Sequence, residues 1–157
     1  MRLMLGTLIA IFLFISAAKA NDFNCLVEAI YHEARSEDVL SQLAVANVIL
    51  TRVESSNFPN TICKVVHQGK YWKGNPIRNR CHFSYWCDGK SERMTDLKSL
   101  IKILSVAEMA LKGTQIKQTV GATHYHAAYV TPFWSSDPQF KSLGQVGTHI
   151  FYIDMRE

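Results

Sequence analysis

Apolar residues near the start of the chain recur at helical spacing and lead onto a carboxylate. Leu26, Ala29 and Ile30 stand at i, i+3 and i+4, which predicts one face of a helix. One more turn along that face reaches Glu33. Because burying an unpaired carboxylate is costly, an acid on this face is either paired or present for chemistry. A salt bridge to Arg35 or another arginine and a chemical role are both open from this pattern.

Three further helices are predicted downstream. Val39–Glu54 is apolar on most sides, which predicts the central buried helix of the domain. Residues 61–67 predict a short helix with Pro59 near its first turn. Residues 96–112 carry a helical apolar stripe, and Gly113 is a natural stop.

The C-terminal third has the pattern of an antiparallel β pair. Residues 122–130 alternate in part and are rich in β-branched and aromatic side chains, and residues 146–153 predict the partner strand. The connection, residues 131–145, contains proline, serine and glycine and predicts irregular structure. Without a repeat or linker, the chain predicts one α+β domain, mainly helical with a small antiparallel sheet near the C-terminus.

Residues 69–90 predict a long loop. Glycine, asparagine and proline break regular structure there. The stretch also holds five aromatic residues: Tyr71, Trp72, Phe83, Tyr85 and Trp86. We interpret it as the wall of a cleft, with at least two of the rings packed on the core.

The N-terminus has the pattern of a secretory signal. Arg2 precedes an uncharged, mostly apolar run over residues 3–18, and Ala-Lys-Ala at residues 18–20 forms a small-x-small cleavage site. The pattern predicts a signal peptide over residues 1–20 and a single mature domain over residues 21–157, exported to the periplasm or secreted. An uncleaved membrane anchor is the alternative.

Composition and charge narrow the class of protein. The 157 residues are 48% hydrophobic and 19% charged, which is typical of a globular domain. The formal net charge is +4, but no run of lysine and arginine is dense enough to predict nucleic-acid binding. The weak positive balance is compatible with an anionic polymer such as a cell wall.

Four cysteines lie after the predicted leader. In an exported protein an even number suggests two disulfides, for which three pairings exist. Cys81 and Cys87 are six residues apart and suit a small closed loop, so we favour that pair together with Cys25–Cys63. A zinc site is the competing interpretation, although no C-x-x-C spacing occurs.

A partly desolvated glutamate suits proton transfer. Desolvation raises the pKa of a carboxyl group, and a general acid near neutral pH can protonate the leaving oxygen of a glycosidic bond. A second carboxylate in a matching context is not evident; Glu37, Asp88 and Asp137 are candidates by elimination. One glutamate acting first as acid and then as base fits another route, in which the 6-hydroxyl of the sugar attacks and a 1,6-anhydro product forms.

The histidines offer a rival chemistry. His124 and His126 are two apart on a predicted strand and therefore point the same way, and His149 lies on the partner strand. Three histidines can hold zinc; the alternative is that they are polar cleft residues or bonded core groups, which the lack of a local zinc motif favours. A nucleophilic Cys81 or Cys87 is a third interpretation, which the expected disulfides disfavour.

Six segments in order resemble the SleB/CwlJ-type cell wall hydrolase family and cover nearly all of the chain after the leader. They are AIYHEARSE at 29–37, QLAVANVILTRV at 42–53, FPNTICKVV at 58–66, CHFSYWCDG at 81–89, the run 121–130, and GTHIFY at 147–152. The resemblance implies a lysozyme-like fold related to lytic transglycosylases and resuscitation-promoting factors.

The resemblance also implies an activity and one catalytic residue. It implies cleavage of peptidoglycan glycan strands between N-acetylmuramic acid and N-acetylglucosamine, with the catalytic glutamate of the family's Glu-Ala-Arg-Gly-Glu motif at Glu33. The chain departs from the family at Ser36, where glycine is usual, and at His82, where glutamine is usual. Ser36 is tolerated unless the backbone needs a positive φ, whereas His82 is expected to alter sugar contacts.

These observations predict an exported, monomeric, cofactor-free enzyme that binds peptidoglycan strands, binds no nucleic acid and has no membrane span after signal cleavage. Glu33 is the expected catalytic residue. The expected substrate-binding residues are Phe83, Ser84, His124, Tyr125, His126, Tyr129 and Trp134. The alternatives are a zinc-dependent wall amidase or peptidase that uses the histidines, and a glycan-binding module without catalysis.

Overall fold

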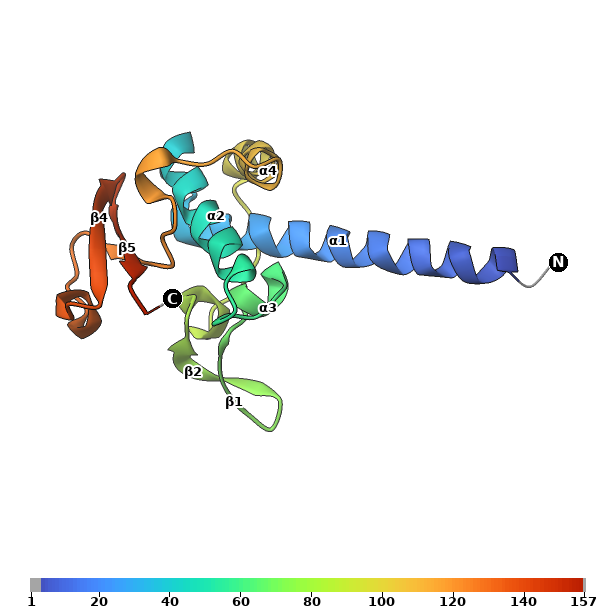
Figure 1. Ribbon diagram of the computed structural model, residues 1–157, viewed down its shortest axis with the longest axis horizontal. Coiled ribbons are helices and arrows are strands. Elements are labelled where there is room, and N and C mark those ends of the chain that lie inside the picture. The colour runs from blue at the N-terminus through green and yellow to red at the C-terminus, as the bar shows by residue number, and fades with distance from the viewer. Residues whose placement is uncertain (1–3, 157) are drawn as a thin grey trace.

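Helices make up most of the domain. The computed structural model describes residues 4–156, with side chains from residue 19 onward. Within this range the α-helices are α1 (Met4–Ala34), α2 (Val39–Glu54), α3 (Ile62–Val66) and α4 (Leu97–Leu111). Short 3-10 helices follow at η1 (Ser84–Cys87), η2 (Lys117–Thr119) and η3 (Phe133–Ser136). The second half of α1 contacts α2, α3 and α4, while its first half extends beyond them (Figure 1).

The strands form two small antiparallel sheets. A hairpin joins β1 (Gly69–Trp72) to β2 (Asn75–Cys81), and a three-stranded sheet has the order β3-β5-β4. The strands of this second sheet are β3 (His124–Ala127), β4 (Phe140–Val146) and β5 (His149–Asp154). The predicted α+β class, mainly helical with a small antiparallel sheet near the C-terminus, is confirmed.

Two segments predicted to be irregular contain strands. The predicted loop 69–90 includes the β1–β2 hairpin, and the predicted connection 131–145 includes β4. Lys73 and Gly74 have φ of 48° and 81°, so they form the two-residue turn that joins Trp72 to its partner Asn75. Glycine and asparagine here belong to a tight hairpin turn and not to a loop, which is why their pattern misled the prediction.

The core lies between the helices and the three-stranded sheet. Its largest fully buried side chains include Leu26 and Ile30 of α1, Ile49 of α2, Ile103 of α4 and Phe151 of β5. Every residue of α2 from Ser41 to Ile49 is buried, which confirms the predicted central helix. The apolar stripe of α1 therefore leads from the core to Glu33.

Capping interactions fix the junction between α1 and α2. Asp38 caps α2 by accepting a hydrogen bond of 2.8 Å from the Ser41 backbone N–H. The buried Gln42 side chain donates to the Ala34 carbonyl at 3.0 Å and so satisfies the last turn of α1. Because Glu33 lies in that last turn, the junction also fixes the position of its carboxylate.

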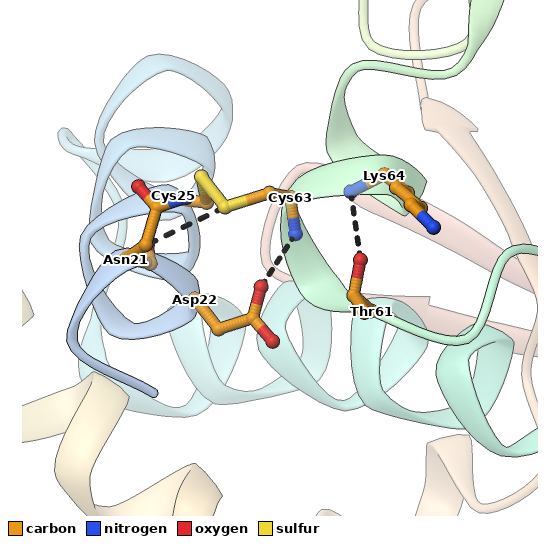
Figure 2. The surroundings of a disulfide bond; sticks show 6 residues. All are labelled: Asn21, Asp22, Cys25, Thr61, Cys63 and Lys64. Atoms are coloured by element: carbon orange, nitrogen blue, oxygen red, sulfur yellow. Dashed lines mark hydrogen bonds between the residues drawn. A yellow bond between two sulfur atoms is a disulfide. The ribbon is translucent and has the colours of Figure 1, made fainter. Parts of the chain in front are cut away.

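A disulfide joins Cys25 of α1 to Cys63 of α3, as the favoured pairing predicts (Figure 2). Figure 2 also shows Asp22, which accepts a hydrogen bond of 3.0 Å from the Cys63 backbone N–H, and Thr61, which accepts one of 3.4 Å from Lys64. These contacts hold the start of α3 against α1.

The second disulfide joins Cys81 at the end of β2 to Cys87 at the end of η1. It closes the small loop that carries Phe83 and Ser84, and it completes the predicted pairing. Among the described residues no cysteine is free.

The predicted leader overlaps the first helix. Residues 1–3 lie outside the described range, whereas residues 4–20 are helical and continuous with the rest of α1. No helix in the described part of the chain carries a stretch that is both long and apolar enough to span a bilayer. Cleavage after Ala20 stays a prediction.

We predict that the two disulfides stabilise the domain unequally. Replacing Cys25 and Cys63 with serine opens a link between residues 38 apart and is expected to lower the free energy of unfolding by about 4 kcal/mol. The same change at Cys81 and Cys87, six residues apart, is expected to cost about 2 kcal/mol. Urea unfolding followed by circular dichroism measures both; an equal loss would contradict the loop-length account.

Candidate active site

The carboxylate of Glu33 meets a tyrosine from the C-terminal sheet. Tyr125 Oη donates a hydrogen bond of 3.0 Å to Glu33 Oε2, across 92 residues of sequence. Arg35, the neighbouring cation, lies 5.4 Å from the centre of the Tyr31 ring and forms no ion pair with Glu33 within the described residues. The alternative of a salt bridge to Arg35 is therefore not met, and Tyr125 is the neutral hydrogen-bond donor to the acid.

The surroundings of Glu33 favour its protonated form. Burial raises its pKa above the ordinary value, and this effect exceeds the opposing effects of the Tyr125 hydrogen bond and the Arg52 guanidinium. Burial and the nearby Glu33 charge also raise the pKa of Tyr125 well above 10, so the phenol stays a hydrogen-bond donor. A neutral, partly buried carboxyl group is suited to donate a proton.

Arg52 provides the cation of the site. It is buried in the last turn of α2, and its Nε donates to the Thr123 carbonyl at 2.7 Å. The guanidinium also lies 5.0 Å and 5.3 Å from the ring centres of Phe58 and Phe83. Arg52 therefore links α2 to the residue before β3 and places positive charge near Glu33.

The alternation of β3 decides which side chains reach Glu33. Tyr125 points to the helices, whereas His124 and His126 point to the opposite face of the strand and contact Trp134 at ring-centre distances of 5.5 Å and 5.6 Å. The expectation that the two histidines share one direction is correct. The side they share is opposite to that of Tyr125, and of the two histidines only His126 borders the cleft over Glu33.

A cleft of about 600 Å³ opens over Glu33. One wall comes from η1 and the loop after it, and the other comes from β3 and the start of β5. The lining residues are Tyr31, His32, Glu33, Arg35, Arg52, His82, Phe83, Ser84, Tyr85, Asp88, Lys90, Ser91, Glu92, Arg93, Thr95, Tyr125, His126, Ala127, Tyr129 and His149.

The structure brings most of the predicted site residues to this cleft. Phe83, Ser84, Tyr125, His126 and Tyr129 all line it together with Glu33. Phe83 and Tyr85 are also buried, which confirms that two rings of the aromatic stretch pack on the core. His82, one of the departures from the family pattern, is exposed at the same wall.

His124 and Trp134 are not among the residues that line the cleft, so their expected contact with substrate stays a prediction. The His124 ring packs edge-on against Phe140 at 4.8 Å, and burial, assisted by Arg52, lowers its pKa to about 4. Trp134 lies between His124, His126 and Tyr152 and borders a separate surface hollow with Phe133 and Asp137. Both side chains stabilise the outer face of the sheet.

The histidines do not form a metal site. His126 Nδ1 donates to the Ala127 carbonyl at 2.9 Å, and Nε2 lies 2.9 Å from Tyr152 Oη, so both ring nitrogens are engaged. His149 pairs with Ala127 across β3 and β5 and contacts Tyr125, on the face opposite His124 and His126. Among the described residues no three metal-ligating side chains converge, so the structure does not form the histidine cluster that the zinc hypothesis requires.

The candidate second carboxylates have different positions. Glu37 accepts a hydrogen bond of 2.7 Å from Thr148 Oγ1 and is not among the cleft residues. Gly147 beside it, with φ of 58°, approaches Ser41 so closely that a Cβ would overlap the Ser41 hydroxyl. Glu37 therefore fastens the β4–β5 turn to the start of α2.

Of the three carboxylates considered as a second catalytic group, Asp88 lines the cleft. Asp137 instead borders the surface hollow beside Trp134. Asp88 accepts from the Lys90 backbone N–H at 2.8 Å and pairs with Lys90 Nζ at 3.6 Å. Glu92 also lines the cleft, and its carbonyl accepts from His32 Nε2 at 3.1 Å. Both belong to the segment between η1 and α4.

Sequence reasoning missed Arg52 and the cleft role of His149. A charged residue inside a helix that is otherwise apolar was the available signal for Arg52. His149 is buried, lines the cleft and has an Nδ1 atom without a hydrogen-bond partner among the described residues. Its signal was the two-residue period of β5, which places it on the same face as the buried Phe151.

Comparison with known proteins identifies the family. The profile of the family described as Cell Wall Hydrolase matches residues 36–152, about three-quarters of the chain. The chain belongs to this Cell Wall Hydrolase family. The match begins at Ser36, three residues after Glu33, so it covers both walls of the cleft but not the carboxylate itself.

Particular relatives are spore cortex-lytic enzymes. The chain is 32% identical to that of Halalkalibacterium halodurans over 133 residues, which cover 83% of this chain and 34% of the relative. It is 48% identical to the Bacillus cereus enzyme over 48 residues, 31% of this chain and 18% of that protein. The chain thus spans about a third or less of these curated relatives.

Two solved structures share the fold. The catalytic domain of the Bacillus cereus SleB protein is 27% identical, covers 85% of this chain and 90% of its own, and has a TM-score of 0.60. The catalytic domain of the germination-specific lytic transglycosylase SleB from Bacillus anthracis is 28% identical, with coverage of 84% and 93% and a TM-score of 0.64. The fold is therefore that of the SleB catalytic domain.

We predict that Tyr125→Phe raises the pKa of the Glu33 carboxyl group. The phenol donates to the ionised carboxylate and favours it, so its loss leaves the effect of burial less opposed. Titration of selectively ¹³C-labelled glutamate by NMR measures the change. Tyr129→Phe is the matched control, because Tyr129 lines the cleft but has 88% of its surface exposed. An unchanged or lowered pKa in Tyr125→Phe would contradict the assignment.

Proposed function

We propose that this protein is an exported peptidoglycan-degrading enzyme that cleaves the bond between N-acetylmuramic acid and N-acetylglucosamine as a lytic transglycosylase. Glu33 is its single catalytic acid and base. The observation that carries the proposal is the partly buried Glu33 in a polar cleft, where burial raises the pKa of its carboxyl group and Tyr125 donates a hydrogen bond to it. Membership of the Cell Wall Hydrolase family and similarity to the two SleB catalytic domains support the same class of substrate.

The reaction begins with proton donation. Glu33 gives its proton to the glycosidic oxygen, the bond from C1 of the muramic acid to that oxygen breaks, and the N-acetylglucosamine leaves as an alcohol. The resulting carboxylate is stabilised by the Tyr125 hydroxyl and by the positive charge of Arg52. These two groups therefore stabilise the negative charge that Glu33 carries once its proton has left.

The second half of the reaction returns the proton. The 6-hydroxyl of the same muramic acid attacks C1, its proton passes to Glu33, and a new C1–O6 bond gives the 1,6-anhydro sugar. No water is consumed and the enzyme regains its starting state. This route needs one carboxylate, which suits a cleft in which Asp88 is already paired with Lys90.

Residues on both walls are positioned to hold the sugars. Tyr129 is almost fully exposed and offers ring surface for stacking, while the buried Phe83 packs beneath the same wall. Ser84 and His82 offer polar groups at the rim, where acetamido groups of the sugars need partners, and His126 lines the cleft with its ring nitrogens bonded to Ala127 and Tyr152. These residues are the proposed substrate-binding set.

The proposed location is outside the cytoplasm. Two disulfides, formed within residues 25–87, are stable in an oxidising compartment, and the peptidoglycan substrate lies there as well. We assign residues 1–20 to a cleaved signal peptide and residues 21–157 to one catalytic domain that acts as a monomer.

We predict that Glu33→Gln lowers the rate of sacculus digestion by about 10³-fold, because glutamine cannot transfer the proton. Glu37→Gln is the matched control: it alters the other carboxylate of the same motif but keeps an acceptor for Thr148, so activity should persist. Clearing of sacculi in a zymogram and thermal unfolding are measured for both variants. Clearing retained by a folded Glu33→Gln variant would overturn the assignment.

The products define the reaction. We predict that sacculi digested by the wild-type protein yield muropeptides with 1,6-anhydromuramic ends, measured by mass spectrometry. Reducing ends would show hydrolysis by water in place of transglycosylation, and free stem peptides would show an amidase. Binding to sacculi without any soluble product would show a glycan-binding module and contradict the proposal.

A further inference from the structure

The β1–β2 hairpin is a basic arm outside the catalytic cleft. It carries Lys70, Lys73, Arg78 and Arg80 and contains no acidic residue. All four cations are exposed, and none takes part in an ion pair within the described residues. In Figure 1 the hairpin projects from the body of the domain below α3. The hairpin therefore has four positive and no negative charges on 13 residues, which creates a local positive field. The net charge of +4 for the whole chain does not reveal this concentration of charge.

The tip of the hairpin presents an aromatic ring. Trp72 has 70% of its surface exposed, and Lys73 Nζ lies 6.0 Å from the centre of its ring. The tight turn at Lys73 and Gly74 sets the direction of the tip. A large exposed indole next to a cation is a surface for stacking on a sugar ring that also bears negative charge.

The base of the hairpin is rigid. Tyr71 Oη donates to the His67 carbonyl at 2.6 Å and accepts from Trp86 Nε1 at 2.9 Å. His67 and Trp86 stack with ring centres 3.6 Å apart. The aromatic residues of the stretch 69–90 therefore fall into three groups. Some are buried in the cleft wall, Tyr71 and Trp86 hold the base of the hairpin, and Trp72 is exposed at its tip.

The arm is continuous with the cleft. The Cys81–Cys87 disulfide ties β2 to the loop that carries Phe83 and Ser84 in the cleft wall. Farther along β2, Arg78 Nε lies 3.6 Å from the position of a Cβ on Gly89, beside the cleft residue Lys90. A polymer that leaves the cleft at Lys90 thus meets Arg78 next.

We propose that the β1–β2 hairpin is an accessory arm that binds the peptidoglycan strand beyond the scissile bond, its cations pairing with carboxylates of the stem peptides and Trp72 stacking on a sugar. The inference rests on the proposed function for its substrate class. Peptidoglycan is the polymer in which sugar rings and carboxylate-bearing peptides alternate along one strand. The spacing of cations along the hairpin around one exposed indole matches that chemistry better than it matches a uniform polyanion.

Binding to sacculi tests the arm without cleavage. Every protein carries Glu33→Gln, so that binding is measured on intact sacculi by co-sedimentation at low salt. Changing Lys70, Lys73, Arg78 and Arg80 to glutamine is expected to weaken binding about tenfold. The matched control changes Lys98, Lys112, Lys117 and Lys141, which are exposed elsewhere, and lowers the net charge equally. We expect the control to bind within about twofold of the parent.

Two further arms identify the ligand. Converting the carboxylates of the sacculi to neutral amides is expected to abolish the difference between the hairpin variant and the control. Trp72→Ala is expected to weaken binding to both untreated and amidated sacculi, whereas Trp72→Tyr keeps a ring and restores binding. Equal binding by the hairpin variant and its control would overturn the proposal. So would a hairpin-dependent difference that persists on amidated sacculi, or that is as large on duplex DNA or anionic lipid vesicles.

The outcome is separable from that of the proposed function. The binding assay uses a variant that cannot transfer the proton, so a wild-type protein without lytic activity would leave the arm's affinity measurable. Conversely, if the wild-type protein is lytic but the hairpin variant binds sacculi as well as the control does, the proposed function stands and the accessory arm is overturned.

Discussion

The hydrogen bond from Tyr125 to Glu33 is the contact on which the site depends. It joins the last turn of α1 to β3, and each end is held by a separate part of the fold. On the helix side, Gln42 satisfies the end of α1. On the sheet side, Tyr125 pairs with Phe151 across β3 and β5, and that phenylalanine is fully buried. Neither element alone would place an acid and its donor at 3.0 Å.

The electrostatics of the site follow from a balance between burial and charge. Burial raises the pKa of Glu33, while Tyr125 and Arg52 oppose the shift without reversing it. Burial thus favours the protonated acid in the resting state, while Tyr125 and Arg52 stabilise the carboxylate that forms during reaction. A direct salt bridge to Arg35 would have favoured the ionised form, and that arginine lies instead over Tyr31.

The helices and the disulfide pairing were predictable from the sequence because their signals are local. The stripe through Leu26 and Ile30 led to Glu33, and the short separation of Cys81 and Cys87 suited one small closed loop. Which face of β3 meets the helices was not predictable, since a two-residue period states that His124 and His126 share a side but not which side. Only the pairing of Tyr125 with the buried Phe151 settles that, and it places His124 and Trp134 outside the cleft.

The hairpin escaped prediction for a different reason. Its strands are almost wholly exposed, so they lack the apolar alternation that marks a half-buried strand. What remained visible was the turn at Gly74 and the aromatic content of the stretch. Tertiary contacts of Tyr71 and Trp86 keep the exposed hairpin rigid, and a sequence pattern does not reveal such contacts. The functional interpretation of its cations likewise depends on their position beside the cleft.

The most direct test of the account compares two titrations. The first, by ¹³C NMR, measures the pKa of the Glu33 carboxyl group in the free protein. The second measures the pH at which kcat/KM for muropeptide cleavage falls on the alkaline side. Because the general acid must be protonated, activity is expected to fall as pH rises through that pKa, and the two values should coincide and rise together in Tyr125→Phe. If activity on the alkaline side falls at a pH unrelated to the pKa of Glu33, the assignment of Glu33 as the general acid is contradicted.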